Sequence, residues 1–325
     1  MTTKRRIESP ARSFRFTGAI RSLAATALLA ASVAAIAADD VTQVYGSYGG
    51  LWHSTGSSSA IANGSNNLLA FEANGTVYGT GVNDAAVNTY RAAQSQSSVV
   101  SAVFRAFEPV ATAIPATGGL NALPESGTYD SNKPRADYLS DGGNGLDLNT
   151  ALFNIPQTTL VFDATIGNAA AITDSVPDIL VTQVGQPSTT VSDVFYFRDA
   201  NGNVVGNSVT ITLSSVTSVG RQNWQFWVPG DTTATVYASP TRDLRLRAYH
   251  LSDFGITTGN MASVVAFVQQ LSGESDLSFI AYNQSALQTS PSPTAAVPVD
   301  SPLMLALLGL LVVAGARRLS AARRG

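Results

Sequence analysis

Apolar and polar residues alternate with a period of two along much of the chain between residues 39 and 288. Val209, Ile211 and Leu213 are separated by single threonines, and Leu244 and Leu246 are separated by an arginine. Side chains two positions apart lie on the same face of a β-strand, so this alternation predicts strands with one buried face. No long run of apolar residues follows the 3.6-residue spacing that indicates an amphipathic helix.

Turn motifs separate several of the predicted strands. Asn74-Gly75 and Asn201-Gly202 each stand between segments rich in apolar residues. Asn-Gly readily adopts the positive φ angles that tight hairpin turns require, so both motifs predict β-hairpins. Residues 279–282 are apolar or aromatic at every position, which predicts a strand that is covered on both faces.

The remaining segments of the body are less regular. Residues 87–110 are compatible with a short helix near 92–101 or with a strand pair, whereas residues 111–134 are rich in Gly, Pro and Ala and predict a long loop. Residues 289–298 have the Ser/Pro/Thr/Ala composition of an extended linker. Frequent strands and turns without strand–helix alternation predict an all-β fold for residues 39–288, specifically an antiparallel β-sandwich of jelly-roll-like type.

The N-terminal region has the layout of a secretory signal peptide. Six Lys and Arg residues precede an uncharged, Ala- and Leu-rich run at 22–38. Ala35 and Ala37 supply the small residues that a signal peptidase cleavage site requires. The run is short for a membrane span of about 20 residues. We therefore expect residues 1–38 to direct export, with signal peptidase as the processing enzyme.

The C-terminal region has the layout of a membrane anchor. Residues 303–316 are apolar throughout, and four arginines follow them. The apolar run is shorter than the span of about 20 residues that is usual for a transmembrane helix, but flanking arginines extend its reach by snorkelling. The positive-inside rule places these arginines in the cytoplasm and the body of the protein outside it. We expect residues 299–325 to form a transmembrane sorting tail.

A short motif precedes this apolar segment, consisting of Val297, Pro298, Val299, Asp300, Ser301 and Pro302. Together with the apolar segment and the arginines, it resembles the sorting tails of Gram-negative exosortase-type systems, including the Ile-Pro-Thr-Leu and Val-Pro-Glu-Pro tail families. Val297, Pro298 and Ser301 fit the first pattern. Asp300 departs from it, as does Leu303, where that family often has Trp. The resemblance implies that an exosortase-type membrane protease acts on the motif. It also implies transient anchoring in the inner membrane and delivery to the cell surface or the extracellular space.

The body between the two terminal segments is acidic. Residues 38–297 hold nine Lys and Arg against twenty Asp and Glu, a net charge of −11, although the whole chain has a net charge of −3. A negative surface repels the phosphate backbone, which argues against a nucleic-acid partner. The chain has no cysteine. Its stability outside the cytoplasm must therefore come from core burial or from metal ions rather than from disulfides.

The sequence offers no established catalytic motif. Its two histidines, His53 and His250, and its lack of cysteine exclude a Cys-based or multi-His zinc site. Asp253 follows His250 closely enough to leave a dispersed catalytic triad open, although a hydrogen-bonded histidine is the simpler interpretation. Asp174 and Asp178 likewise leave a glycosidase carboxylate pair open, although a solvated turn is simpler. We expect the protein not to be an enzyme.

Two segments have partial features of calcium sites. Residues 141–147 contain Gly-Gly-x-Gly-x-Asp, the unit of calcium-binding β-roll repeats, but in a single copy. A glycine-rich loop is therefore the simpler interpretation, with a non-repeat calcium site at Asp141 or Asp147 as the alternative. Residues 199–203 have the acceptor spacing of an EF-hand loop, but Val204 stands where an EF-hand needs Gly, which favours a hairpin turn. No other cofactor is expected.

Aromatic and basic residues provide weak candidates for ligand binding. In a strand, Trp224 and Phe226 share one face and Trp227 lies on the other. One face should be core, and the other face could present an aromatic ring to a sugar, unless both tryptophans pack in the core. Arg245 and Arg247 form a basic stripe that could meet an anionic polysaccharide, unless they only keep an exposed strand face soluble.

These features favour an exported, surface-sorted, non-catalytic protein that binds or builds extracellular matrix or exopolysaccharide. The link to exopolysaccharide comes from the exosortase-type resemblance. A secreted polysaccharide hydrolase and a calcium-dependent adhesin are the two alternatives. The expected partners are the membrane, signal peptidase, an exosortase-type enzyme and a polysaccharide.

Overall fold

The computed structural model describes residues 39–54, 61–109, 113–185, 190–231 and 241–289. These residues form mainly antiparallel β-sheets with one α-helix, which confirms the predicted all-β class. The predicted signal peptide with Ala35 and Ala37, the linker beyond residue 289 and the sorting tail with its motif at 297–302 lie outside the described residues. None of the helices in the described segments is both long and apolar enough to cross a membrane.

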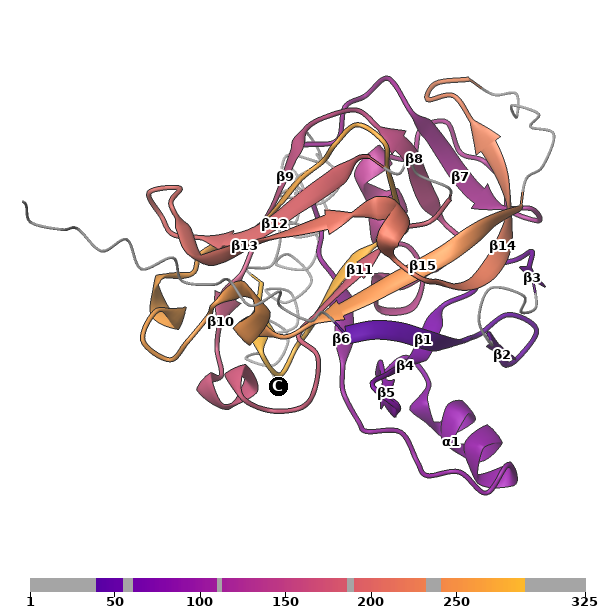
Figure 1. The fold of residues 1–325 in the computed structure, drawn as a ribbon. Helices are drawn as coiled ribbons and strands as arrows, with labels where there is room; N and C mark the ends of the chain where they lie inside the picture. The colour runs from indigo at the N-terminus through magenta and orange to yellow at the C-terminus, as the bar shows by residue number, and fades with distance from the viewer. Residues whose placement is uncertain (1–38, 55–60, 110–112, 186–189, 232–240, 290–325) are drawn as a thin grey trace, which may run out of the picture. The chain divides into compact units, whose positions relative to one another are not determined.

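The largest sheet has a main path of eight paired strands, with five further strands joined to it (Figure 1). The main path runs, in order, through β17 (Ser275–Leu277), β8 (Ala151–Ile155), β7 (Leu120–Pro124), β14 (Ser218–Trp227), β15 (Thr241–Tyr249), β1 (Asp39–Gly46), β4 (Leu68–Ala73) and β5 (Thr76–Gly79). The further strands are β11 (Ile179–Thr182), β18 (Ile280–Asn283), β6 (Phe104–Ala106), β2 (Trp52–His53) and β3 (Ile61–Ala62). Strand β3 runs parallel to β14, whereas the other pairs in this sheet are antiparallel.

Two smaller sheets and several short helices complete the described body. The four-stranded sheet has the order β13 (Val204–Thr212), β12 (Ser192–Arg198), β16 (Ala266–Gln270) and β9 (Thr159–Asp163), and β10 (Thr165–Ile166) pairs with β19 (Leu287–Gln288). The α-helix is α1 (Asp84–Ala93). The 3-10 helices are η2 (Arg135–Leu139), η3 (Gly143–Gly145), η4 (Ala169–Ile172), η5 (Leu213–Ser215), η6 (Leu251–Phe254) and η7 (Met261–Ser263).

Strand β15 joins three parts of the large sheet. Residues 241–245 pair with β14, residues 247–248 pair with β1, and residues 246–249 pair with β11. Leu244 and Leu246 are buried, whereas the arginines beside them are partly exposed. This pattern confirms the predicted alternation, and it makes β15 the strand on which the surrounding pairings depend.

Strands β11 and β18 separate two hydrophobic cores. Ile179 and Val181 of β11 pack in the first core, and Leu180 packs in the second. On β18, Ala281 packs in the second core, while its two neighbours pack in the first. All four residues of each strand are buried, which confirms the prediction that residues 279–282 include a strand covered on both faces.

Both predicted hairpins are confirmed. Strands β4 and β5 pair around Asn74, with φ of 50°, and Gly75, with φ of 73°, the positive values that the motif predicts. Strands β12 and β13 pair across the second turn, where the carboxylate of Asp199 accepts hydrogen bonds from the backbone N–H groups of Asn201 and Asn203. Asp199 therefore stabilises a hairpin turn in this segment, as the sequence favoured.

Helix α1 begins earlier than the sequence indicates, at Asp84 instead of near residue 92. Asn83 caps it, because its side-chain oxygen accepts a hydrogen bond from the backbone N–H of Ala86. Val87 is the one residue of this helix that is buried. A single buried position leaves no apolar periodicity from which to locate a helix.

Strand β7 lies within the segment that the composition predicts to be a long loop. It pairs with β8 on one side and β14 on the other. Just before it, Gly119 has φ of 65°, and a Cβ atom built there would lie 2.4 Å from the backbone oxygen of Phe153. The glycine therefore permits two backbones to approach closely at the start of a central strand, and does not mark a loop.

Replacing Leu246 with Ala should destabilise the protein strongly, because the side chain is 1% exposed and belongs to β15. We expect the free energy of unfolding to fall by about 2–5 kcal/mol, measured by chemical denaturation. Val204→Ala, at a position that is 45% exposed, is the control and should change it by less than about 0.5 kcal/mol. Equal losses in the two variants would contradict the central role of β15.

Candidate functional site

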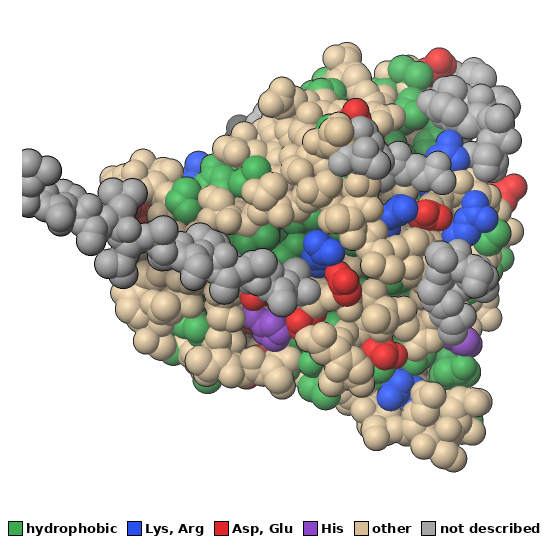
Figure 2. Space-filling view, viewed as in Figure 1, with side chains coloured by type: hydrophobic (Ala, Val, Ile, Leu, Met, Phe, Trp, Pro, Cys, Tyr) green, Lys and Arg blue, Asp and Glu red, His purple; other side chains and the backbone are tan. Residues whose placement is uncertain are grey.

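A polar cleft of about 410 Å³ lies where the start of β1, the β4–β5 hairpin, the loop after η4 and the end of β15 meet. Most of its lining residues carry hydrogen-bonding side chains: Asp39, Asn74, Thr76, Tyr78, Thr173, Asp174, Ser175, His250 and Ser252, with Ile172 beside them. On the face shown in Figure 2, a histidine is flanked by acidic side chains. Because its residues come from four distant parts of the chain, the cleft exists only in the folded protein.

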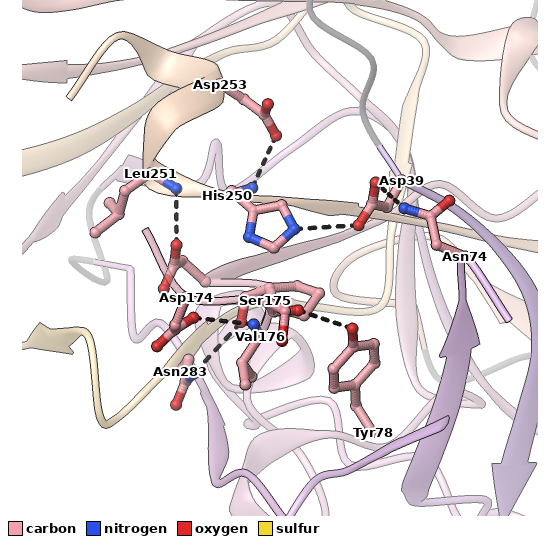
Figure 3. Close-up of polar contacts among 12 residues, drawn as sticks. Asp39, Asn74, Tyr78, Asp174, Ser175, Val176, His250, Leu251, Asp253 and Asn283 are labelled. Atoms are coloured by element: carbon pink, nitrogen blue, oxygen red, sulfur yellow. Dashed lines mark hydrogen bonds and ion pairs between the residues drawn. The ribbon is translucent and has the colours of Figure 1, made fainter. Parts of the chain in front are cut away.

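The carboxylate of Asp39 joins two sides of this cleft (Figure 3). Its Oδ2 atom lies 3.1 Å from Nε2 of His250, and its Oδ1 atom accepts a hydrogen bond from Nδ2 of Asn74. Asp39 is paired in register with Ala248 of β15, so its side chain lies close to the residue that follows β15. A carboxylate can only accept in this pair, so Nε2 of the imidazole is the donor.

Helix η6 holds the backbone of His250. The carboxylate of Asp253 accepts a hydrogen bond of 2.8 Å from the backbone N–H of His250, and the N–H of Asp253 donates to the carbonyl of His250. Burial raises the pKa of Asp253, and the hydrogen bond and charge of His250 oppose this effect. Asp253 therefore binds the main chain, while the imidazole contacts Asp39, so Asp253 does not orient the ring as a catalytic triad requires.

Tyr78 and the loop after η4 form another wall of the cleft. The hydroxyl of Tyr78 donates a 2.8 Å hydrogen bond to the carbonyl of Ser175, and Oδ1 of Asp174 accepts a 2.9 Å hydrogen bond from the N–H of Val176. Burial raises the pKa of Tyr78, so its hydroxyl remains a donor at neutral pH. Asp174 and Ser175 are exposed and line the cleft.

Asp178 is enclosed and does not line the cleft. Its side chain has no exposed surface, its Oδ2 atom accepts a 2.7 Å hydrogen bond from the N–H of Leu251, and its Oδ1 atom has no hydrogen-bond partner. Burial raises the pKa of Asp178 to about 8, the Leu251 N–H opposes this effect, and the charges of Asp174 and Asp253 reinforce it. Asp178 therefore retains its proton at neutral pH, and Asp174 and Asp178 differ sharply in their exposure.

The groups that line the cleft are suited to hydrogen bonding. Asp39 and Asp174 supply carboxylates, Ser175 and Ser252 supply hydroxyls, and His250 supplies an imidazole. Such a set accepts and donates hydrogen bonds at several points, and polar groups make up most of the lining. It is therefore complementary to a small polyhydroxylated or partly cationic ligand.

The predicted calcium ligand Asp147 lies away from solvent, at 4% exposure. Its carboxylate accepts hydrogen bonds from the backbone N–H groups of Asn66 and Asn149 and from the hydroxyl of Thr150, at 2.9–3.0 Å. Burial raises the pKa of Asp147, and these three donors oppose the effect. The carboxylate therefore holds two loops together.

The other predicted calcium ligand, Asp141, forms an ion pair with Lys133 at 2.8 Å and also accepts a hydrogen bond from the N–H of Gly142. Across the ranges that the structure describes, no three His, Cys, Asp or Glu side chains form a group that could hold a metal ion. The contacts of Asp141 are those of a glycine-rich loop, and calcium binding stays a prediction.

The tryptophans of β14 point in opposite directions, as predicted, but both faces of the strand are covered. Trp224 and Phe226 pack in the second core, and Trp227 packs in the first. The three rings are at most 5% exposed, and Nε1 of Trp224 donates to the carbonyl of Asn149. Both tryptophans therefore pack in the core, which was one of the two interpretations that the sequence allowed, and neither presents a ring to a sugar.

The predicted basic stripe on β15 is tied to neighbouring groups. Arg245 forms an ion pair of 2.8 Å with Asp243 and donates to the carbonyl of Val216, and Arg247 forms an ion pair of 2.9 Å with Asp40. Their side chains are 13% and 17% exposed, and Figure 2 shows basic and acidic side chains adjacent to one another. These arginines stabilise the sheet, and their donors are not available as a continuous basic stripe.

Sequence reasoning singled out His250 and Asp174 separately but did not bring them together. It missed Asp39, Asn74 and Tyr78 as residues of one cleft. Asn74 was predicted only as part of a hairpin turn, and Asp39 and Tyr78 had no predicted role. Only the pairing of β1 with both β4 and β15 places these side chains side by side.

Asp178→Asn should make stability less dependent on pH. The pKa of this carboxyl is about 8 in the folded protein, against an ordinary value of 3.8. The folded state therefore holds the proton more tightly, so the contribution of Asp178 is fully present below about pH 4 and is lost as pH rises to about 8. Asparagine keeps an oxygen for the Leu251 N–H and does not ionise. The free energy of unfolding of Asp178→Asn, relative to wild type, should therefore rise between about pH 4 and pH 8. Denaturation curves recorded at stepped pH measure this difference.

The exposed Asp163→Asn variant is the control for this experiment and should retain the wild-type profile. Parallel profiles for Asp178→Asn and wild type would contradict a proton held by Asp178 in the folded state.

Comparisons with protein-family models, with curated proteins and with solved structures found no match for this chain.

Proposed function

We propose that this chain is exported, sorted to the cell envelope and used there as a non-catalytic protein that binds extracellular polysaccharide. In this proposal the body is a jelly-roll-like sandwich, and the C-terminal tail anchors it at least transiently in the inner membrane until an exosortase-type enzyme acts. The observation that carries the proposal is the polar cleft, whose carboxylate, amide, hydroxyl and imidazole groups complement the hydroxyl groups of a sugar.

The rigidity of the cleft supports a binding role. Asp39 is held by both Asn74 and His250, and the backbone of His250 is held by Asp253. Groups that are fixed before binding lose little conformational entropy when a ligand arrives. The volume of about 410 Å³ lies within the range of small-molecule sites, so the cleft would take a short stretch or an end of a polysaccharide.

A polysaccharide hydrolase is the second candidate, and one observation favours it. Asp178 retains its proton at neutral pH, as the general acid of a glycosidase must. A general acid must also contact the leaving oxygen, and Asp178 has no exposed side-chain surface. Only Asp174 of this pair lines the cleft. Binding without turnover is therefore the preferred function.

The distribution of charge along the chain supports export. Ten of the nineteen Lys and Arg residues lie in the two terminal segments, and the body between them has a net charge of −11. A basic, apolar leader at one end and an apolar, basic tail at the other form the arrangement that directs a body across a membrane.

Export is tested by fusing alkaline phosphatase after Thr289, which leaves the described body intact. We expect the fusion that retains residues 1–38 to be active, because this enzyme requires an oxidising compartment. The same fusion without residues 1–38 is the control and should be inactive. A second fusion carries, at the same position, a reporter that is active only in the cytosol. Activity of this reporter, together with no phosphatase activity in the first fusion, would contradict export.

Ligand binding is tested with immobilised neutral and acidic exopolysaccharides and the secreted protein. We expect at least one glycan to be retained without shortening, and Ser252→Trp to weaken binding at least tenfold by filling the cleft. Ser263→Trp, at another exposed serine of a 3-10 helix, is the matched control and should bind like wild type. Shortening of the glycan would favour the hydrolase, and unchanged binding by Ser252→Trp would contradict the cleft as the site.

A further inference from the structure

A second cavity, of about 260 Å³, lies between the segment that leads into β7, the loop before η2 and the residues after β14. Its lining includes Ile114, Ala116, Tyr129, Lys133, Arg135 and Pro229. It shares no lining residue with the polar cleft. Its walls are more apolar than those of the cleft, and its charged groups are basic.

Arg135 is the most unusual residue of this cavity, since it is buried at 9% exposure. Its Nε atom donates to Oδ1 of Asn121, and its Nη1 atom donates to the carbonyls of Pro115 and Gly118. Its Nη2 atom is buried and has no hydrogen-bond partner. The guanidinium is thus held in place by neutral acceptors alone, with one nitrogen unsatisfied.

Within the part of the chain that the structure describes, no carboxylate pairs with Arg135, since none of the ion pairs within 4.0 Å includes it. Asp130, Asp137 and Asp231, the acidic residues of the neighbouring loops, are exposed. Burial lowers the pKa of Arg135, and only the nearby Tyr129 and Tyr138 oppose this effect. A buried cation without a counter-ion destabilises a folded protein, so its presence beside a cavity calls for an anion.

The other polar groups near Arg135 do not supply that anion. The hydroxyl of Tyr138 is buried without a hydrogen-bond partner. Lys133 lies 4.9 Å from the centre of the Tyr138 ring and is already paired with Asp141. The site therefore has one uncompensated positive charge. Because the guanidinium charge is delocalised over its nitrogens, it attracts an anion in the cavity without requiring a contact to Nη2.

Tyr129 gives the cavity a fixed aromatic wall. Its ring is partly buried and stacks on Trp227, with ring centres 4.8 Å apart and planes 6° from parallel. Its hydroxyl lies 3.4 Å from Nδ2 of Asn121, the residue whose oxygen binds Arg135. The wall and the guanidinium are therefore positioned by one network, as in a site that binds an apolar sugar face and a charged group together.

We propose that this cavity binds the carboxylate of an acidic sugar, with Arg135 as its charged anchor and Tyr129 as its aromatic wall. A single uncompensated charge matches a single carboxylate. The volume of the cavity accommodates a single sugar ring. The ligand would therefore be a free sugar acid, or one acidic residue of a polysaccharide whose other residues lie outside the cavity. The inference extends the proposed function to acidic glycans, but the site stands on its own contacts and does not depend on the cleft.

The test is isothermal titration of the secreted protein with glucuronate, and with glucose, which has a neutral hydroxymethyl group in place of the carboxylate. We expect saturable binding of glucuronate, at least tenfold stronger than that of glucose and weakened by added salt. Ala116→Phe places a ring in the cavity and removes none of the hydrogen-bond partners of Arg135. It should weaken glucuronate binding at least tenfold. Thr117→Phe, at the adjacent exposed position that does not line the cavity, should bind like wild type.

Several results would overturn this proposal. The first two are equal binding of glucose and glucuronate, and no binding of glucuronate. The third is wild-type binding of glucuronate by Ala116→Phe. The fourth is equal competition by inorganic sulfate, which would show an anion site without preference for a carboxylate. Ser252→Trp, which fills only the cleft, should leave glucuronate binding unchanged. Failure of polysaccharide binding at the cleft is therefore distinguishable from failure at this cavity. Arg135→Met is a secondary variant, because it also releases the carbonyls of Pro115 and Gly118.

Discussion

The pairing of β15 with β14, β1 and β11 is the constraint on which the rest of the structure depends. It fixes the register of strands that come from distant parts of the chain. It also aligns Leu244 and Leu246 in the second core, while Arg245 and Arg247 meet Asp243 and Asp40. The cleft follows from the same pairing, since His250 is the next residue after β15 and Asp39 begins β1.

Buried carboxylates link distant segments of this cysteine-free chain. Asp193 accepts hydrogen bonds from the side chains of Gln269 and Ser275 and from the N–H of Ser272, and so links β12 to the chain around β16 and β17. Asp276, with a pKa raised to about 8 mainly by burial, accepts from the N–H of Asn154. Such groups add direction to the packing of cores that apolar contacts alone would leave less specific. They also make stability dependent on pH in a way that a disulfide does not.

Local features of this fold could be predicted from the sequence, and features created by tertiary contacts could not. Asn74-Gly75 carries its own turn geometry, and the alternation around Leu244 and Leu246 is decided by one strand. Strand β7 is different, because it is defined by hydrogen bonds to β8 and β14 that its own composition does not reveal.

The candidate sites show the same limit. The opposite orientations of Trp224 and Trp227 follow from the geometry of a strand, but nothing local states that a second core covers Trp227. Arg135 stands at the end of a segment that resembles a loop, and its burial depends on backbone carbonyls at Pro115 and Gly118. Arg245 and Arg247 were more conspicuous in the sequence, yet their partners Asp243 and Asp40 neutralise them.

The position of β1 has a consequence for the order in which the chain folds. Its first two residues are Asp39 and Asp40. Asp39 contacts His250 and Asp40 contacts Arg247, and both partners lie more than 200 residues later in the chain. The first strand cannot complete its contacts until nearly all of the body has been synthesised. Contacts of such long range slow folding, because a large loop must close before they form. A chain that crosses a membrane unfolded, beginning with its N-terminus, would therefore remain open during passage and close only after β15 has emerged.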